Sequence, residues 1–210
     1  MAVLEKSRGI SSATPPLQAG DSLTRTEFER RYAAMPNLKK AELIEGIVYI
    51  ASPVRASVHG IPHVKLSTLL QVYATRYPGL IVADNSTVRL DTFNEPQPDL
   101  LPMRENGQAT IDAEGYINGA PELIAEIAAS SVSYDLHQKK RTYLRAGVQE
   151  YLVWLTDENR LIWWQFDDGE FIEISPDAEG ILTSPTFPGL VIDSAALTSG
   201  DLAQALARLA

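Results

Sequence analysis

Between residues 121 and 156 a strand, a helix and a second strand follow one another closely, and this order limits the possible folds more than any other feature. The run PELIAEIAA, residues 121–129, is apolar on both sides of Glu126 and has the length of a strand buried on both faces. A helix is predicted over 135–146 and a further strand over QEYLVWL, residues 149–155. Strands linked through a helix favour a right-handed crossover, so part of the sheet should be parallel and covered.

The remaining elements extend this unit into an α/β fold with a mixed sheet. Residues 56–77 have the apolar spacing of a core helix, and the runs at 80–90 and 98–103 are typical of strands. The order from residue 56 to residue 156 is therefore αβββαβ. After residue 160 the chain is expected to add an antiparallel extension and a short helix at 200–209. Tight hairpin turns are predicted at two places, Glu45-Gly46 and Asp168-Gly169.

Length and composition indicate how the chain is organised and where it works. With 210 residues, 45% of them apolar, one domain is expected over residues 21–210, and the Pro- and Gly-containing residues 1–20 are expected to be a flexible tail. No apolar run approaches the roughly 20 residues that span a bilayer, and no secretory signal is apparent, so a cytoplasmic protein without membrane contact is expected. The absence of cysteine excludes disulfides and thiolate sites. The net charge of -9 opposes nonspecific attraction to nucleic acid, so a polyanion must meet a local basic patch or a bridging cation.

Glu126 requires a chemical explanation, because an ionised carboxylate is costly to remove from water and is usually paired, protonated or bound to a metal. Asp99, in the run QPD, begins an earlier apolar strand. Carboxylates on neighbouring strands, about 4.8 Å apart, can share one divalent cation if their registers agree. Simpler interpretations are that Asp99 caps a turn after Pro98 and that Glu126 pairs with a core lysine.

The helix after Glu126 carries a group of basic residues in an otherwise acidic chain. Leu136 should face the sheet, and the positions three and four residues later, Lys139 and Lys140, lie beside it. At least one of these lysines is expected to point toward the two acids, and helical geometry alone leaves both open. Two acids that hold Mg²⁺ and a lysine that orients a water and offsets negative charge are suited to phosphodiester hydrolysis.

Other polar residues near these positions have structural interpretations as well. Asp135 is expected to be an N-cap, a role worth about 1 kcal/mol. His59 and His63 lie four residues apart, a spacing that allows two imidazoles to meet one metal, but no HExxH pattern accompanies them. They could instead line a cleft. Arg141, like Lys140, is typical of a solvated helix face.

Several runs resemble the Uma-two family of restriction-endonuclease-like proteins, a domain-of-unknown-function family within the PD-(D/E)XK nuclease superfamily. They are AELIEG, VRL, QPDLL, GAPELIAEIAASSVSYDLHQKKRTYLRAGVQEYLVW and SPTFPGLVID, and the resemblance covers about residues 22–209. It implies a restriction-endonuclease-like αβββαβ core. It also implies that Asp99 is the acid of the PD motif, that Glu126 is the acid of the (D/E)XK motif, and that Glu42 in AELIEG matches a recurrent family Glu.

The position of the lysine departs from the superfamily pattern. There the lysine lies two residues after the acid, where this chain has Ala128. The Uma-type pattern places it on the following helix, four residues after an Asp, which implies Lys139 after Asp135.

The resulting hypothesis is a Mg²⁺-dependent DNA endonuclease, with Mn²⁺ as an alternative ion. Asp99 and Glu126 are expected to bind the metal, and Glu42 and Lys139 to assist catalysis. DNA is expected to approach the cations of residues 139–145, and a homodimer would suit the cutting of two strands. The alternative hypothesis, based on the displaced lysine and the acidic composition, is a catalytically degenerate fold that acts as a nucleic-acid-binding or assembly module.

Overall fold

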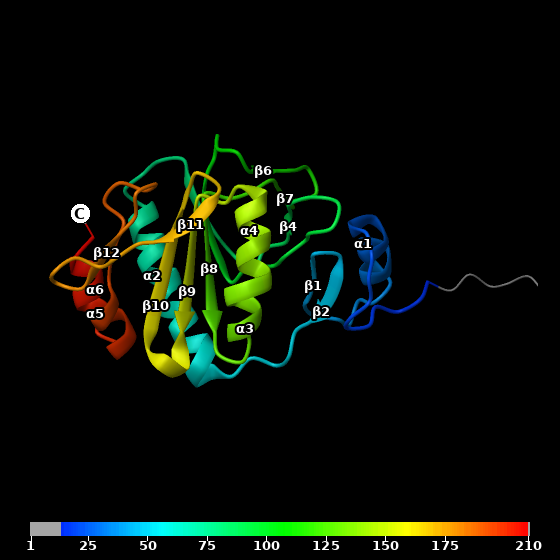
Figure 1. Cartoon of the computed structure of the whole chain (residues 1–210), viewed down its shortest axis with the longest axis horizontal. Helices are drawn as coiled ribbons and strands as arrows, with labels where there is room; N and C mark the ends of the chain where they lie inside the picture. The colour runs from blue at the N-terminus through cyan, green and yellow to red at the C-terminus, as the bar shows by residue number, and fades with distance from the viewer. Residues whose placement is uncertain (1–13, 210) are drawn as a thin grey trace, which may run out of the picture.

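The computed structural model describes residues 14–209 and shows a mixed sheet with helices on both faces (Figure 1). Six strands form this central sheet in the order β11-β10-β9-β8-β5-β3. Their bounds are β3 Leu80–Asp84, β5 Leu100–Arg104, β8 Leu123–Ala128, β9 Glu150–Leu155, β10 Arg160–Asp167 and β11 Glu170–Glu173. Only the β8–β9 pair is parallel among these six, and the other neighbours are antiparallel.

The predicted strand–helix–strand unit is present and forms the middle of the molecule. Every residue of β8 and β9 is buried, as expected for strands covered on both faces. Between them lies a continuous helical segment made of α3 (Val132–Tyr134), a π-helical turn η2 (Asp135–Lys139) and α4 (Lys140–Ala146). Gly147 ends this segment with a φ of 83°, the left-handed conformation that glycine adopts at low cost. The αβββαβ order predicted from the sequence is confirmed.

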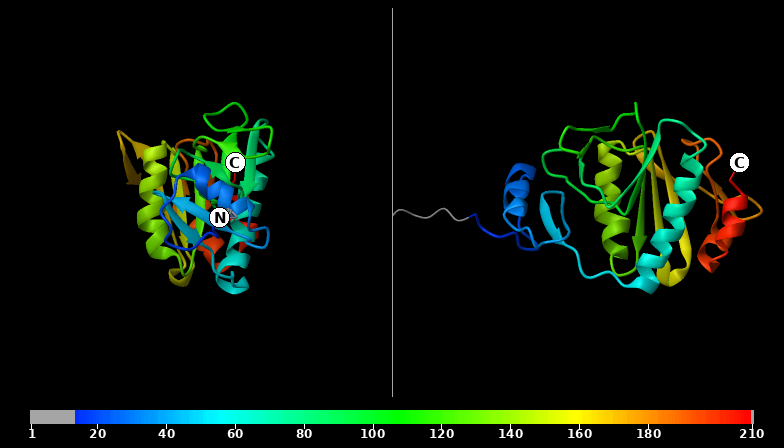
Figure 2. Two further views of the ribbon diagram at one scale, coloured as in Figure 1. Left: turned by 90° about the vertical axis from the view of Figure 1, so that its right-hand side faces the viewer. Right: turned by 180° about the vertical axis from the view of Figure 1, so that it is seen from behind.

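Two helical layers enclose the sheet and create two cores. Figure 2 shows α2 (Ile61–Ala74) and α4 on opposite faces of the sheet. Leu66, Leu70 and Tyr73 of α2 pack with the residues of β8 and β9 that face this helix. On the other face Tyr143 and Tyr151 belong to a second core. Because both faces are filled, any polar side chain that points out of the middle of β8 must find a partner within the protein.

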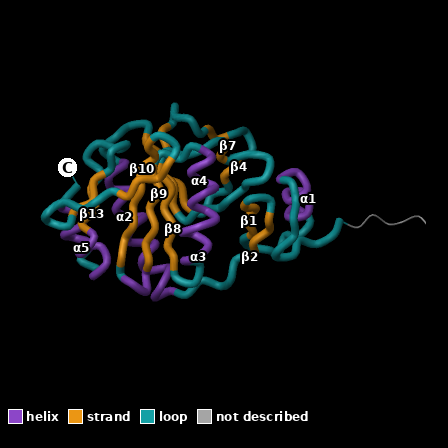
Figure 3. Tube along the Cα trace, in the orientation of Figure 1, coloured by secondary structure: helices purple, strands orange, loops and turns teal. Residues whose placement is uncertain are grey.

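A smaller unit precedes the central sheet. It contains α1 (Arg25–Ala33) and the hairpin of β1 (Ala41–Ile44) and β2 (Ile47–Ile50), which pack around a separate apolar cluster. The hairpin turn is at Glu45 and Gly46, as predicted, with φ values of 52° and 76°. In Figures 1 and 3 this unit lies beside the edge of the main body that carries α4 and the β4–β7 region. A π-helical turn, η1 (Ala56–Gly60), then leads into α2.

The strand predicted over 80–90 is wrong as a single element. The central sheet takes only β3, and the chain turns at Asn85, whose φ of 46° interrupts the extended conformation. Residues Val88–Arg89 form β4, which joins a separate three-stranded sheet, β4-β7-β6, with β7 (Ile117–Asn118) and β6 (Thr110–Ile111). This separate sheet lies beside α1, where Arg89 of β4 is 2.8 Å from Glu29 of α1.

The C-terminal part follows the predicted antiparallel extension with one addition. The Asp168-Gly169 turn joins β10 to β11, and β12 (Ile181–Thr183) pairs with β13 (Val191–Asp193). The terminal helix is α6 (Leu202–Ala207), and a preceding helix, α5 (Ser194–Ser199), was not predicted. Asp193 begins α5 by accepting a hydrogen bond from the Ala196 amide.

The sequence predicts a flexible tail over residues 1–20, and residues 1–13 of it lie outside the described residues. Within the described part Leu17 is buried, and the Gly20 amide donates to the Val48 carbonyl. The packed part of the chain therefore begins earlier than predicted. No helix within residues 14–209 is long and apolar enough to cross a membrane.

Candidate active site

The antiparallel pairing of β5 with β8 brings Asp99 beside Glu126. Leu100 lies opposite Ala125, so Asp99, just before β5, lies next to the second half of β8. There Asp99 Oδ2 accepts a hydrogen bond from the Ile127 amide at 2.8 Å. Asp99 and Glu126 both line one cleft, so the registers agree as the sequence hypothesis required.

Glu126 points toward the helical layer that contains α4, where Lys139 and Tyr143 meet it. Lys139 Nζ donates to Glu126 Oε1 at 2.9 Å, and the Tyr143 hydroxyl donates to the same oxygen at 2.8 Å. Lys139 is only 3% exposed. Lys140 instead places its Nζ 3.9 Å from the ring centroid of Trp164. The structure therefore distinguishes the two lysines, and Lys139 is the one that reaches the acids.

Lys139 is the last residue of the π-helical turn η2, which begins at Asp135. The helix begins at Val132 rather than at Asp135, so the predicted N-cap role of Asp135 is wrong. Asp135 is buried within the turn, accepts a hydrogen bond from Ser131 Oγ, and lies 3.8 Å from Lys139 Nζ. Both residues thus face the interior from one helical turn, and π-helical turns are frequent at functional sites.

Glu42 reaches the same group from the β1–β2 hairpin. Ala41 and Leu43 point into the N-terminal apolar cluster, so Glu42 between them faces the opposite side. Its Oε1 lies 3.0 Å from Lys139 Nζ and accepts a hydrogen bond from the Gln97 amide at 2.8 Å. The residues singled out in the sequence, Asp99, Glu126, Lys139 and Glu42, are therefore brought together by four separate parts of the chain.

The acids around Lys139 have opposite pKa shifts. Burial raises the pKa of Glu126 to about 8, and the charges of Asp99, Asp135 and Glu42 add to this, although Lys139 opposes it. Burial would also raise the pKa of Asp99, but the hydrogen bond from His59 and the charge of Lys40 hold it well below its usual range.

Lys139 itself remains a cation. Burial would lower its pKa, but the charges of Glu126, Glu42 and Asp135 raise it well above its usual value. Even with Glu126 protonated, the three other buried acids, Glu42, Asp99 and Asp135, outnumber this one buried lysine, so a surplus of negative charge remains.

The acids open onto a cleft of about 1190 Å³. Exposed or partly exposed cations on its rim are Lys39, Lys40 and Arg55. Of the cations in residues 139–145, on which the sequence hypothesis placed the approach of DNA, only Lys139 lines this cleft. Arg141 and Arg145 both pair with Glu45, at 3.0 and 2.9 Å.

The sequence did not indicate that Lys40 is a cleft residue, and it left the role of His59 and His63 open. Lys40 Nζ lies 3.5 Å from Asp99 Oδ1, and only the folding of the β1 hairpin over the sheet makes this contact. His59 Nε2 lies 3.1 Å from Asp99 Oδ2, and His63 Nε2 lies 2.8 Å from Asp84 Oδ1. The i,i+4 spacing of the histidines was the available signal, and they line the cleft, as one interpretation of the sequence held.

The donor set fits a hard divalent cation. Mg²⁺ is usually bound by one or two carboxylates, with water and substrate phosphate in its other positions. Asp99 and Glu126 provide that number of carboxylates, and a carboxylate that accepts hydrogen bonds on one oxygen keeps acceptor capacity on the other. Within residues 14–209 no three His, Asp or Glu side chains form a ready metal cage. The surplus negative charge beside Lys139 is of the sign that a cation would neutralise.

Comparisons with known proteins agree with this fold. The Uma2 family model, described as "Putative restriction endonuclease", matches residues 25–197. The chain is also similar to the crystal structure of a "putative nuclease belonging to DUF820" from Anabaena variabilis ATCC 29413, with a TM-score of 0.63 and 16% identity over 81% of this chain and 96% of that chain. At that identity the likeness shows a shared restriction-endonuclease-like fold. No curated protein matches the chain.

Proposed function

Since the chain belongs to the Uma2 family of restriction-endonuclease-like proteins, we propose that it is a divalent-metal-dependent nuclease that hydrolyses phosphodiester bonds in DNA. The observation that carries this proposal is the meeting of Asp99 and Glu126 beside the buried Lys139 in an open cleft. Two carboxylates and one ammonium group are the parts that metal-assisted phosphodiester hydrolysis requires.

Asp99 and Glu126 would hold Mg²⁺ or Mn²⁺. When bound, the ion would polarise the phosphate and lower the pKa of a water molecule. His59 and the Ile127 amide fix Asp99 Oδ2, so this carboxylate is already oriented and ionised at neutral pH. This preorganisation reduces the cost of reaching the productive geometry.

Lys139 is a positioning cation in this proposal rather than a base, because its raised pKa keeps it protonated. Its ammonium group holds Glu126 Oε1 and Glu42 Oε1, at 2.9 and 3.0 Å. From there it would orient the attacking water and stabilise negative charge that develops on the phosphate. Glu42 would act by holding Lys139 in place.

Cleavage of supercoiled plasmid in Mg²⁺ or Mn²⁺ tests the proposal. We expect nicking by the wild type and a loss of roughly 100-fold or more in Asp99→Asn, Glu126→Gln and Lys139→Met. Glu150→Gln is a matched control, since Glu150 is a buried acid on the adjacent strand β9 that binds Ser184 and lies outside the cleft lining. Nicking that survives in both Asp99→Asn and Glu126→Gln would refute the proposed site.

The second candidate is a non-catalytic nucleic-acid-binding or assembly module. The buried ion pairs of Lys139 with Glu126 and Glu42 favour it, because they partly satisfy these acids without a metal. Thermal unfolding with Mg²⁺ or Ca²⁺ distinguishes the two functions. A ligand that binds only the folded state raises its Tm, so a metal-dependent nuclease should show a rise that Asp99→Asn abolishes. No rise, together with no nicking, would favour the module.

A further inference from the structure

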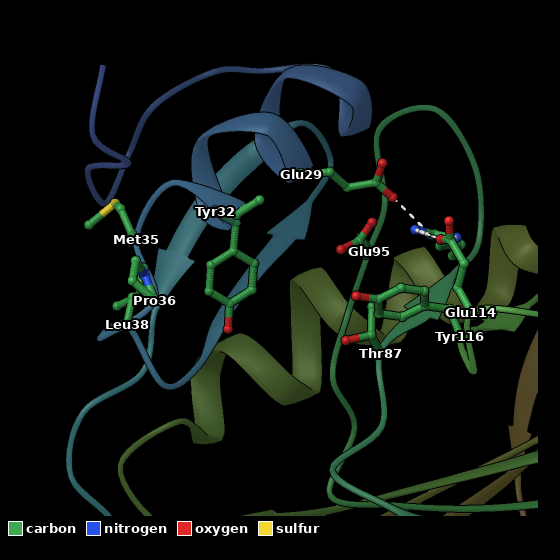
Figure 4. A pocket seen from close by; sticks show the side chains of 11 residues that line it. Glu29, Tyr32, Met35, Pro36, Leu38, Thr87, Glu95, Glu114 and Tyr116 are labelled. Atoms are coloured by element: carbon green, nitrogen blue, oxygen red, sulfur yellow. Dashed lines mark hydrogen bonds and ion pairs between the residues drawn. The ribbon is translucent and has the colours of Figure 1, made fainter. Parts of the chain in front are cut away.

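A second cavity, of about 390 Å³, lies between the N-terminal unit and the β4–β7 region (Figure 4). One wall comes from α1 and the segment after it, with Tyr32, Met35 and Leu38. The other comes from β4 and the turn before β7, with Arg89 and Tyr116. Among the described residues it shares only Leu38 with the cleft, so it is a separate space.

Glu95 is the unusual residue of this cavity. It is only 4% exposed, and hydrogen bonds between its backbone and that of Leu43 fix its position. Its Oε2 atom accepts no hydrogen bond from any residue in the range 14–209. Figure 4 shows its carboxyl group between the rings of Tyr32 and Tyr116. The Glu95 carboxyl group has a side-chain hydrogen bond with Glu29, yet Oε2 lacks a donor. A buried oxygen of this kind is costly, so a donor from outside the chain would stabilise it.

The neighbouring cation is already engaged with other acids. Arg89 lies 2.8 Å from Glu29 Oε1 and 2.9 Å from Asp112 Oδ2, and its guanidinium stacks over Tyr116 at 4.1 Å from the ring centroid. Glu114, also on the cavity wall, is 3.5 Å from the same group. The lining therefore retains an excess of acids, together with two aromatic rings.

We propose that this cavity binds a guanidinium or amidinium group, with Glu95 as its acceptor and the rings of Tyr32 and Tyr116 beside it. A planar group with several N–H donors matches a carboxylate in geometry and charge. Aromatic rings attract such cations through their π faces. The volume lies within the range of small-ligand sites. Phosphate-bearing ligands are disfavoured, because Glu29 and Glu114 would repel them.

Binding should become tighter as pH rises. Burial, and then a side-chain hydrogen bond with Glu29 and the negative charge of Glu29, raise the pKa of Glu95 to about 8, whereas Arg89 and Arg25 lower it. At neutral pH much of the Glu95 population is therefore protonated, and a cation must displace that proton. Glu29 and Glu114 also line the cavity.

Titration with agmatine, followed by calorimetry or NMR, tests the site without reference to nuclease activity. We expect saturable binding that is tighter at pH 8.5 than at pH 6.5, and about tenfold or more weaker in Glu95→Gln. Glu170→Gln, on exposed β11, is the control and should bind as the wild type does. Tyr116→Leu, a partly exposed position, should also weaken binding and gives a second test if Glu95→Gln fails to fold.

No saturation below about 10 mM agmatine, or equal affinity in wild type and Glu95→Gln, would overturn the proposal. A capped Ala-Arg-Ala peptide identifies the source of the group. Tighter binding of the peptide than of agmatine would indicate an arginine side chain of a protein partner, and weaker binding would indicate a free small molecule. Agmatine binding is measured without nuclease activity, so a protein that fails to nick DNA can still bind agmatine. The binding proposal and the nuclease proposal can therefore be refuted separately.

Discussion

Glu126 is a buried acid whose ionisation opposes folding. Its pKa is raised to about 8 in the folded protein, against an ordinary value of 4.5. Between these values the folded state keeps a proton that the unfolded chain has lost. The stabilisation from this proton is complete below pH 4.5 and is lost as pH rises through 8. We therefore expect the metal-free wild type to lose roughly 1 to 3 kcal/mol more stability than Glu126→Gln between pH 5 and pH 8, as measured by urea unfolding in EDTA.

The comparison with Glu126→Gln isolates this residue from other titrating groups. Asp135 and Glu95 also have raised pKa values, of about 6 and about 8, but both are present in the two proteins. Asp99 has the opposite shift, from an ordinary value of 3.8 downward, so its contribution changes below pH 4. Parallel stability curves for wild type and Glu126→Gln would show that Glu126 is ionised throughout.

Lys139→Met should destabilise the metal-free protein by about 3 to 5 kcal/mol, because it leaves buried acids without their cation. Above about pH 8, where Glu126 is ionised in the wild type, the loss should be smaller in the Lys139→Met/Glu126→Gln double variant, since one of those acids is then neutral. A double-mutant cycle from urea unfolding measures this coupling. Strictly additive losses would mean that the contact of 2.9 Å between the two side chains contributes little.

At the scale of single residues, the sequence indicated that Asp99, Glu126 and Lys139 lie together, but it did not indicate that Lys40 and Tyr143 join them. Glu126 was recognisable because a charge inside an apolar strand needs a partner, and Asp99 because it begins the neighbouring strand. Lys40 and Tyr143 gave no comparable signal. A lysine after a loop and a tyrosine on a helix are ordinary, and only long-range packing brings them to 3.5 Å from Asp99 and 2.8 Å from Glu126.

At the scale of elements, the β1–β2 hairpin determines where Glu42 lies, and Gly46 determines the hairpin. Gly46 has a φ of 76°, and an added Cβ would lie 3.3 Å from the Leu23 carbonyl oxygen. Gly169 is a matched control, because it occupies the other predicted hairpin turn with a φ of 89° and no atom within 4 Å. Gly46→Ala should therefore cost more than the roughly 1 kcal/mol of left-handed strain expected for Gly169→Ala. Thermal unfolding measures both, and equal losses would show that the Leu23 backbone gives way.

Elements with strong local signals were predicted, and those set by tertiary contacts were not. Both hairpin turns, the end of the helix at Gly147 and the two buried strands follow from local chemistry. The break at Asn85 and the π-helical turn have no comparable pattern. The turn is one residue wider than an α-helical turn, and the burial of Asp135 and Lys139 against Glu126 accompanies it.

At the scale of the whole molecule, a net charge of -9 means that the proposed DNA substrate would have to bind through local cations. The cleft rim supplies Lys40, which lies next to Asp99. Arg208, just after α6, pairs with Glu179 and is not part of the cleft lining. Each phosphate contact releases counterions, so affinity should fall steeply with salt. Fluorescence anisotropy of a labelled duplex in Ca²⁺, from about 50 to 200 mM KCl, measures the slope. Lys40→Ala should weaken binding and reduce the slope by about 1, and Arg208→Ala should leave it unchanged. If Lys40→Ala and Arg208→Ala changed the affinity and the salt slope equally, DNA would be responding to the overall charge. The cleft would then not be the DNA-binding surface.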